Sequence, residues 1–268
     1  MNEFIWEFSR DRTRRLALRG IRADRRKPFE YRPITIQTNV GSHADGSAYV
    51  QLGNTKVVAG VKFEIGAPYP DTPDKGALIT DAELLPLASP TFEPGPPDEN
   101  AIELARVVDR GIRESNAIDL SKLVIREGEL VYLVFVDLRV LDADGNLFDA
   151  ASMAAIAALG TAKIPRVEED KIIREEYVKT LELNEIPLLT TFVKIGSAIF
   201  VDPTLEEERA MDARFSVATV DDGSIVAVQK GGEGSFTAAE IERMIERSIE
   251  LGKELRKKVK EAIEHGKD

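Results

Sequence analysis

The stretch VYLVFVDLRVLDADGNLFDAASMAAIAALG, residues 131–160, determines the fold that we expect for this chain. Residues 131–136 are continuously apolar and the pattern then alternates, which is typical of a central strand leaving a core. Asp144-Gly145 predicts a tight turn. Residues 150–159 are mostly alanine and predict a helix whose backbone can lie close to a sheet. A strand, a turn and a helix should therefore form the centre of the molecule.

The start of this predicted helix is the most obvious place for an anion. Free backbone N–H groups and the positive end of the helix dipole both stabilise phosphate there. Here the start holds Leu147, Phe148 and Asp149. Leucine and phenylalanine offer no donors, and an aspartate would compete with the ligand for the same amides. We interpret Asp149 as a helix cap and expect the site to be closed to phosphate.

The composition excludes several classes of site. The chain has 268 residues, enough for one large or two ordinary domains, and 43% hydrophobic residues support a real core. No cysteine is present, which excludes disulfides, thiol catalysis and Cys-ligated zinc. With only His43 and His265 as imidazoles, we expect no metal site, no cofactor and no Ser-His-Asp triad. The absence of a long apolar run or a signal peptide predicts a cytoplasmic protein with no membrane contact.

Positive charge is concentrated in one part of an acidic chain. The net charge is −11, yet residues 1–32 hold ten basic and five acidic residues. Such a basic arm can bind RNA, or it can lie on an acidic neighbouring subunit. We favour an amphipathic helix that docks, because apolar residues are interleaved with the charges. They are Phe4, Ile5, Phe8, Leu16 and Leu18.

Residues 98–116 are predicted to form a helix with two distinct faces. The apolar face is expected to hold Ile102, Ala105, Val108 and Ile112. Three arginines at spacings of four and three form a stripe on another face: Arg106, Arg110 and Arg113. This stripe has two interpretations. It is either a solvated face with ion pairs to Glu103, Asp109 and Glu114, or a surface that follows the phosphates of single-stranded RNA.

An acidic cluster lies in the second half of the chain. It consists of Asp202, Glu206, Glu207, Glu208 and Asp212. Paired carboxylates can perform acid–base chemistry or hold a divalent metal ion. Three consecutive glutamates cannot all face one point, however, so we expect a short solvated helix.

Further strands are predicted on both sides of the central segment. Residues 35–66 alternate as two or three strands, and one more strand-like piece covers residues 78–87. Residues 161–187 are charged and weakly patterned, as in a connection between two lobes. Residues 188–232 then predict several short strands. A capping box, Thr237 with Glu240, opens the closing helix and explains the glycine-rich loop before it without a ligand. A long apolar stripe along this helix predicts that it lies over the second sheet.

Five ordered segments together resemble the RNase PH family of phosphate-dependent exoribonucleases. They are RADRRKPFEYRPI (22–34), DGSAYVQLGNTKVVAGV (45–61), ADGNLFDAASMAAIAAL (143–159), FVDPTLEEE (200–208) and KGGEGSFTAAEIERMI (230–245). The resemblance implies an RNase PH-like α/β fold of the α+β type. It would consist of a ribosomal protein S5 domain 2-like core and a C-terminal RNase PH lobe, each a mixed or antiparallel sheet packed with helices. We expect a basic arm at residues 1–32, a core domain at 33–185 and a C-terminal domain at 186–268.

Within that family, the DPTLEEE segment and the helix before RADRR are similar to the non-catalytic ring subunit of the archaeal exosome. That resemblance implies a hexameric ring of three heterodimers with a catalytic RNase PH-like paralogue, together with RNA-binding cap subunits and a single-stranded RNA substrate. The chain's role would be to bind RNA and to help structure the partner's active site. In related rings the RNA path borders the first long helix, which here carries Arg106 and Arg110.

This chain departs from the catalytic members at three positions. Asn146, Leu147 and Phe148 stand where those members have a Gly-Ser-Arg or Gly-Thr-Arg phosphate grip. Arg214 aligns with their catalytic aspartate, although Asp212 is only two residues away. The sequence GPPDEN (95–100) replaces an arginine-rich stretch. We therefore expect no intrinsic catalysis. The alternative is a phosphorolytic exoribonuclease with an atypical site such as Asp212 and Arg214.

Overall fold

The first sheet carries the strand that the sequence placed at the centre. The computed structural model describes residues 3–266, with side chains from Trp6 onward. The sheet has the order β1-β2-β3-β6-β4, with the short β5 pairing β6. Only β4 runs parallel to its neighbour β6. The strands are β1 (Ile34–Thr38), β2 (Gly46–Leu52), β3 (Thr55–Gly66), β4 (Ala77–Leu84), β5 (Val124–Arg126) and β6 (Leu130–Asp142).

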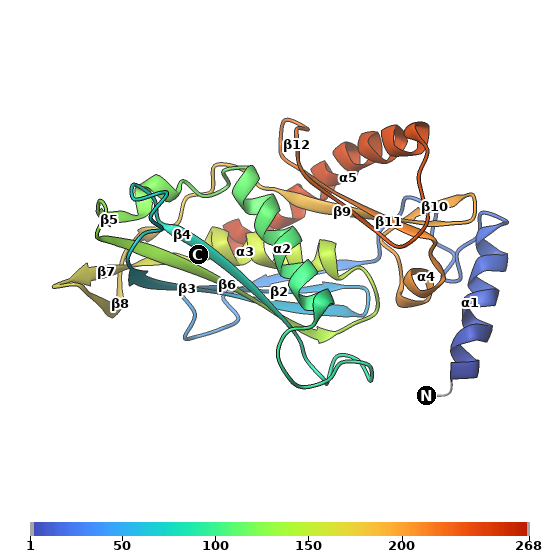
Figure 1. Ribbon diagram of the computed structural model, residues 1–268, viewed down its shortest axis with the longest axis horizontal. Helices are drawn as coiled ribbons and strands as arrows, with labels where there is room; N and C mark the ends of the chain where they lie inside the picture. The colour runs from blue at the N-terminus through green and yellow to red at the C-terminus, as the bar shows by residue number, and fades with distance from the viewer. Residues whose placement is uncertain (1–2, 267–268) are drawn as a thin grey trace.

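The second sheet is antiparallel and has the order β10-β9-β11-β12. Its strands are β9 (Leu188–Ile195), β10 (Ala198–Val201), β11 (Ala213–Thr219) and β12 (Ile225–Gly231). The two sheets follow one another along the long axis of the molecule (Figure 1). The predicted α/β fold class of two sheets packed with helices is confirmed.

The helices cover the sheets and join them. They are α1 (Glu3–Ala17), α2 (Glu99–Glu114), α3 (Leu147–Thr161), α4 (Leu205–Ala210) and α5 (Ala238–His265), with a 3-10 turn at Leu120–Leu123. Helix α3 packs on β2 and β3 of the first sheet and on β9 of the second. Gly46 of β2 permits this close approach, because a Cβ there would collide with the Ala158 carbonyl and with Ala162. One continuous hydrophobic core therefore includes residues of both sheets.

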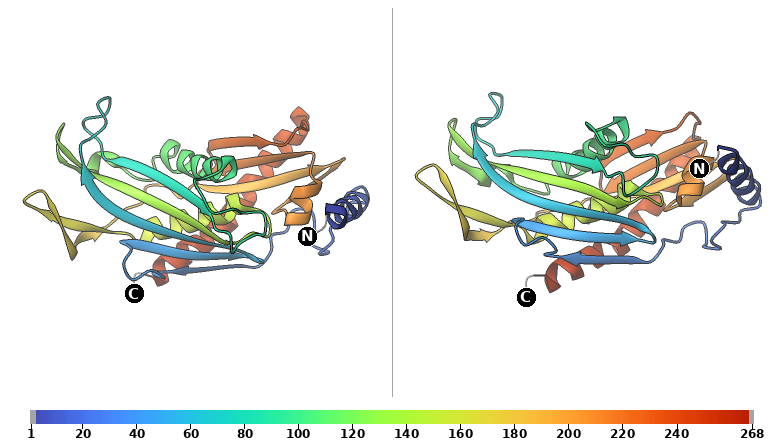
Figure 2. Two further views of the ribbon diagram at one scale, coloured as in Figure 1. Left: turned by 60° about the horizontal axis from the view of Figure 1, so that its bottom comes forward. Right: turned by 90° about the horizontal axis from the view of Figure 1, so that it is seen from below.

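Two predicted elements differ from the structure. Residues 161–187 are not a plain connection, since β7 (Lys163–Glu168) and β8 (Lys171–Thr180) pair as a hairpin. The hairpin turns at Glu169 and Asp170, both with positive φ, and it projects from one end of the molecule (Figure 2). The closing helix α5 was expected over the second sheet only, but it also contacts α3 and β1. The predicted domain boundaries after residues 32 and 185 stay a prediction.

Helix α2 forms where predicted, with Asp98 as its N-cap, but its buried face is rotated from the expected one. Ile102, expected in the core, is 57% exposed. Leu104 and Val107 are buried in its place. The apolar residues of this helix cover more than one face, so periodicity alone does not select the one that meets the sheet.

Candidate functional site

The start of α3 is the centre of the site, and an internal carboxylate occupies it. Asn146 adopts a left-handed conformation with φ +56° and donates its backbone N–H to the Glu208 carboxylate at 2.8 Å. Glu208 comes from α4, in the acidic cluster. Burial raises the pKa of Glu208, although the Asn146 N–H and the nearby Arg214 favour its charged form. The position at which a helix would bind phosphate is thus filled by a side chain of the same protein.

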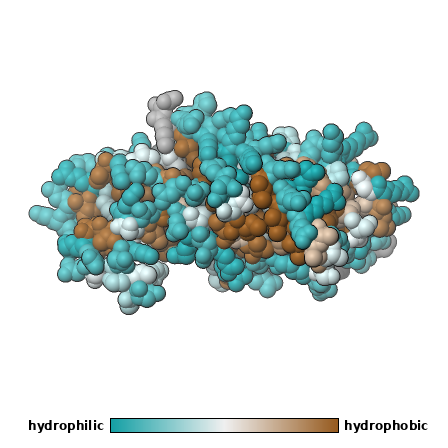
Figure 3. All heavy atoms as spheres, turned by 90° about the horizontal axis from the view of Figure 1, so that it is seen from above, coloured by the Kyte–Doolittle hydropathy of each residue, from teal (hydrophilic) through white to brown (hydrophobic). Residues whose placement is uncertain are grey.

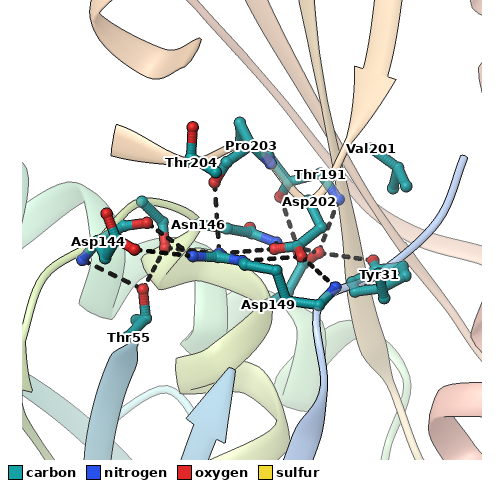
Figure 4. Close-up of polar contacts among 12 residues, drawn as sticks. Tyr31, Thr55, Asp144, Asn146, Asp149, Thr191, Val201, Asp202, Pro203 and Thr204 are labelled. Atoms are coloured by element: carbon teal, nitrogen blue, oxygen red, sulfur yellow. Dashed lines mark hydrogen bonds and ion pairs between the residues drawn. The ribbon is translucent and has the colours of Figure 1, made fainter. Parts of the chain in front are cut away.

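Asp149 is not the helix cap that the sequence suggested. It lies in the first turn of α3, three residues after the N-cap residue Asn146, and is completely buried. Its carboxylate accepts hydrogen bonds from the Tyr31 hydroxyl, the Asn146 amide and both the backbone N–H and hydroxyl of Thr191 (Figure 4). These four hydrogen bonds favour the charged carboxylate, but the effect of burial is larger and raises the pKa of Asp149 to about 7. Asp149 therefore links α3 to the second sheet.

The Asp202 carboxylate accepts hydrogen bonds from several charged and polar groups at once. It has no exposed surface and accepts hydrogen bonds from the guanidinium groups of Arg26 and Arg32 and from the side chain of Asn146. The Arg32 backbone N–H donates to the same carboxylate at 2.8 Å. The segment RADRRKPFEYRPI is thus anchored to the second lobe by buried charge.

The acidic cluster is not the solvated helix that we expected. Glu207 is 2% exposed and forms a two-pronged ion pair with the equally buried Arg22, at 2.6 and 2.8 Å. Glu207 also completes a capping box with Thr204. Asp202 and Glu207 are buried because the arm supplies arginine partners for both, whereas Glu206 is exposed. Spacing along the sequence gave no sign of these pairs. Among the described residues, no group of His, Asp or Glu side chains is arranged to hold a metal ion.

The basic arm docks, as favoured from the sequence, but on its own chain. Helix α1 lies against α4, where Arg209 stacks on Trp6 and Arg14 pairs with Asp212 at 2.9 Å. Two apolar residues expected in the docking face, Phe8 and Leu18, are instead exposed. The expected contribution of Phe4 and Ile5 lies outside the described side chains.

Arg214 and Phe148 fill the space beside the helix start. The Arg214 guanidinium lies 4.2 Å from the centre of the Phe148 ring and donates to both carboxylate oxygens of Glu103, each at 2.9 Å. Gln229 donates to the same carboxylate at 2.7 Å. The structure thus brings Asn146, Phe148 and Arg214 to one site. No local sequence pattern predicts the bond between Arg214 and Glu103, because these residues lie 111 positions apart in the chain.

Asp212 is engaged elsewhere. Its carboxylate accepts from the Gly196 N–H at 2.6 Å and from Arg14. Burial opposes its ionisation, but the Gly196 bond and the Arg14 charge outweigh that effect and lower the pKa of Asp212. A carboxylate held in its charged form by two donors is poorly suited to deliver a proton.

The arginine stripe of α2 divides into two parts. Arg113 is held by Asp109 through two hydrogen bonds and donates to the Leu78 carbonyl. Arg106 and Arg110 are exposed, and within residues 3–266 neither forms an ion pair or a side-chain hydrogen bond. Of the ion pairs expected for a solvated face, only that between Arg113 and Asp109 is present in this part of the chain.

Comparisons with known proteins identify the family. Residues 30–165 match the model of the 3′ exoribonuclease family, domain 1, and residues 185–250 match that of domain 2, the two RNase PH models. The chain belongs to the RNase PH family. This RNase PH-like chain is 52% identical over 248 residues to a Thermococcus gammatolerans protein named exosome complex component Rrp42, covering 91% of each chain.

Two solved structures share the fold of this RNase PH-like chain closely. A chain of the Archaeoglobus fulgidus exosome with RNA bound to the active site matches with a TM-score of 0.90 and 48% identity, covering 96% of this chain and 99% of that one. A chain of an archaeal exosome core matches with a TM-score of 0.86 and 44% identity, covering 96% and 98%. No helix within residues 3–266 has the length and apolar character needed to cross a membrane.

Proposed function

We propose that this chain is a non-catalytic, RNA-binding ring subunit of an archaeal exosome, a 3′-to-5′ phosphorolytic RNA-degrading complex. The observation that carries the proposal is the start of α3. There the Glu208 carboxylate accepts a hydrogen bond from the backbone N–H of the N-cap residue Asn146, and Phe148 with Arg214 fills the adjoining space. A phosphate would have to displace a negative charge and a stacked pair. Similarity to relatives named exosome components supports membership of the ring.

The partner that we propose is a catalytic RNase PH-like paralogue, alternating with this chain in a hexameric ring of three heterodimers, with RNA-binding cap subunits on one face. Several large apolar side chains are exposed on the single chain, as expected where subunits meet. Hydrophobic areas also interrupt the hydrophilic surface near the middle of the face shown in Figure 3. The most exposed apolar residues are Phe8, Leu18, Leu87, Ile102 and Val178.

The chain's contact with RNA is assigned to Arg106 and Arg110. Both guanidinium groups are exposed on one helix, and no carboxylate of the described chain is paired with them. Contacts to phosphates position RNA without reading its sequence. In this proposal the subunit helps present the RNA 3′ end to the partner's active site. Arg113 contributes less, because Asp109 already holds it.

The first prediction separates this function from the alternative, an atypical exoribonuclease using Asp212 and Arg214. The purified chain alone should release nucleoside diphosphates from a single-stranded RNA at least about 1000-fold more slowly than its assembly with the catalytic relative does. The reason is that the chain lacks a phosphate grip and a catalytic acid. The measurement is phosphate-dependent RNA shortening. The control is the same reaction without phosphate. Robust release by the partner-free chain would contradict a non-catalytic role.

The second prediction concerns the stripe. Arg106→Glu with Arg110→Glu should leave folding and assembly intact and weaken RNA binding by the complex at least about tenfold. The slope of log affinity against log salt concentration should become shallower by the amount that about two phosphate contacts contribute. Affinity should be measured by fluorescence anisotropy at several salt concentrations.

A matched control for the stripe is Lys253→Glu with Lys257→Glu on α5. It makes the same charge change at the same spacing on another exposed helix face. If both double variants weaken binding equally, the effect is one of net charge. If the Arg106 and Arg110 variant binds like the wild type, the stripe is only a solvated helix face.

A further inference from the structure

Arg214 holds a carboxylate that would otherwise stand next to the proposed RNA contacts. Glu103 lies on α2, Arg214 on β11 and Gln229 on β12. The guanidinium of Arg214 donates to both Glu103 oxygens at 2.9 Å, and the Gln229 amide adds a third bond at 2.7 Å. The Arg214 side chain is 14% exposed and that of Glu103 is 25% exposed. This ion pair is therefore largely removed from solvent.

The position of Glu103 on α2 gives this pair its significance. Glu103 precedes Arg106 by three residues and Arg110 by seven, and both spacings return to the same face of a helix. A glutamate three residues before an arginine is an ordinary intrahelical partner. In this structure Glu103 is bound to Arg214 and Gln229 instead, across to the second sheet.

The local structure is built to accommodate Arg214. Its guanidinium lies over the Phe148 ring at 4.2 Å, a cation–π contact that fixes its direction. Its cross-strand neighbour on β12 is Gly231, and a Cβ there would lie 2.8 Å from the Arg214 Nη2. Phe148 therefore supports the arginine on one side, and the absence of a side chain at Gly231 leaves it room on the other.

We propose that Arg214 is a positioning residue for RNA binding. It draws the Glu103 carboxylate away from Arg106 and Arg110 and cancels its charge. Both arginines then remain available to RNA phosphates, and the Glu103 carboxylate does not present its negative charge to the strand. The inference rests on the proposed function of α2. It gives a role to the basic residue that stands where the sequence alignment expects an acid.

The test uses the chain assembled with its catalytic relative and a single-stranded RNA. Arg214→Met keeps an apolar stem over Phe148 but removes the charge. It should weaken RNA binding about three- to fivefold and make the salt slope shallower by about one phosphate contact, because Glu103 then pairs with Arg106. The KM for RNA should rise while kcat at saturation stays the same. Circular dichroism and the mass of the assembly should not change.

Rescue distinguishes the charge from packing. Glu103→Gln keeps a hydrogen-bond acceptor for Arg214 but has no charge to cancel, so alone it should bind RNA at least as tightly as the wild type. Combined with Arg214→Met, it should restore affinity and salt slope to within about twofold of the wild type. If the double variant binds as weakly as Arg214→Met, then Arg214 acts through packing or through its own contact with RNA. That result, or wild-type binding by Arg214→Met, would overturn the inference.

Measurement alongside the Arg106 and Arg110 double variant separates this inference from the proposed function. If that variant binds RNA normally, the assignment of α2 as the RNA contact fails. If that variant loses affinity while Arg214→Met does not, α2 binds RNA without help from Arg214, and only the positioning role fails.

Discussion

Asp202→Ala is expected to lower the free energy of unfolding of this chain by about 4 kcal/mol. The carboxylate has no exposed surface and binds two guanidinium groups, those of Arg26 and Arg32. Its removal would leave the largely buried Arg32 with only the Asp144 carboxylate at 3.8 Å, and Arg26 with only Asp24. Removing one partner from a buried charge cluster in this way costs more than the pairing contributes. Asp202 also has a φ of +48°, a conformation that aspartate and asparagine tolerate better than alanine.

The comparison that isolates burial is Asp24→Ala. Asp24 pairs with the same Arg26 at 2.6 Å, but its side chain is 35% exposed. Its removal should therefore cost less than about 1 kcal/mol. Both variants should be measured by denaturant unfolding of the purified chain at neutral pH. A loss at Asp202 no larger than that at Asp24 would show that the arm is not held by buried charge.

Asp149 should make stability depend on pH in the opposite sense to a typical aspartate. Burial raises the pKa of Asp149 to about 7 in the folded chain, from the 3.8 of an aspartate in water. Between these two values the folded state binds a proton that the unfolded state releases, so stability falls as pH rises. The contribution is complete below the unfolded pKa and is lost as pH passes through about 7.

The measurement is the difference in unfolding free energy between the wild type and Asp149→Asn, at pH 5 and pH 8. Asparagine is close in shape and cannot titrate. Relative to this variant, the wild type should lose on the order of 2–3 kcal/mol from pH 5 to pH 8, since each pKa unit corresponds to about 1.4 kcal/mol. Other carboxyl groups also titrate, among them Glu208, whose pKa is raised by burial, and Asp212, whose pKa is lowered. Their contributions to the pH dependence of stability are the same in both proteins and cancel in the difference. A difference that is constant with pH would mean that Asp149 stays ionised.

Much of the fold could be predicted because it depends on local patterns. The apolar run of β6, the Asp144-Gly145 turn and the alanine-rich α3 all lie where residues 131–160 indicate. The Thr237 capping box is present as expected. Each pattern reports burial or a turn within a few residues of itself, and such information does not require the rest of the chain.

The candidate site was predictable in part. Leu147 and Phe148, which carry no donors, predict a helix start that is closed to phosphate, and the structure places a carboxylate there. The residue that closes it, Glu208, could not be predicted, because it arrives from α4 and meets Asn146 only in the folded chain. The cap was misassigned to Asp149 for the same reason, since its partners Tyr31 and Thr191 are distant in sequence.

Sequence patterns were sufficient for most of the elements, though not for the β7–β8 hairpin, and for the family resemblance. The absence of cysteine by itself excludes disulfides and thiol chemistry. Tertiary structure alone decided which charges are paired. It buried Glu207 against Arg22, gave Glu103 to Arg214 rather than to Arg106, and left Arg106 and Arg110 exposed. The physical reason is one of range. Hydrophobic periodicity repeats along the chain, whereas an ion pair depends on two side chains that meet only after the sheets have packed.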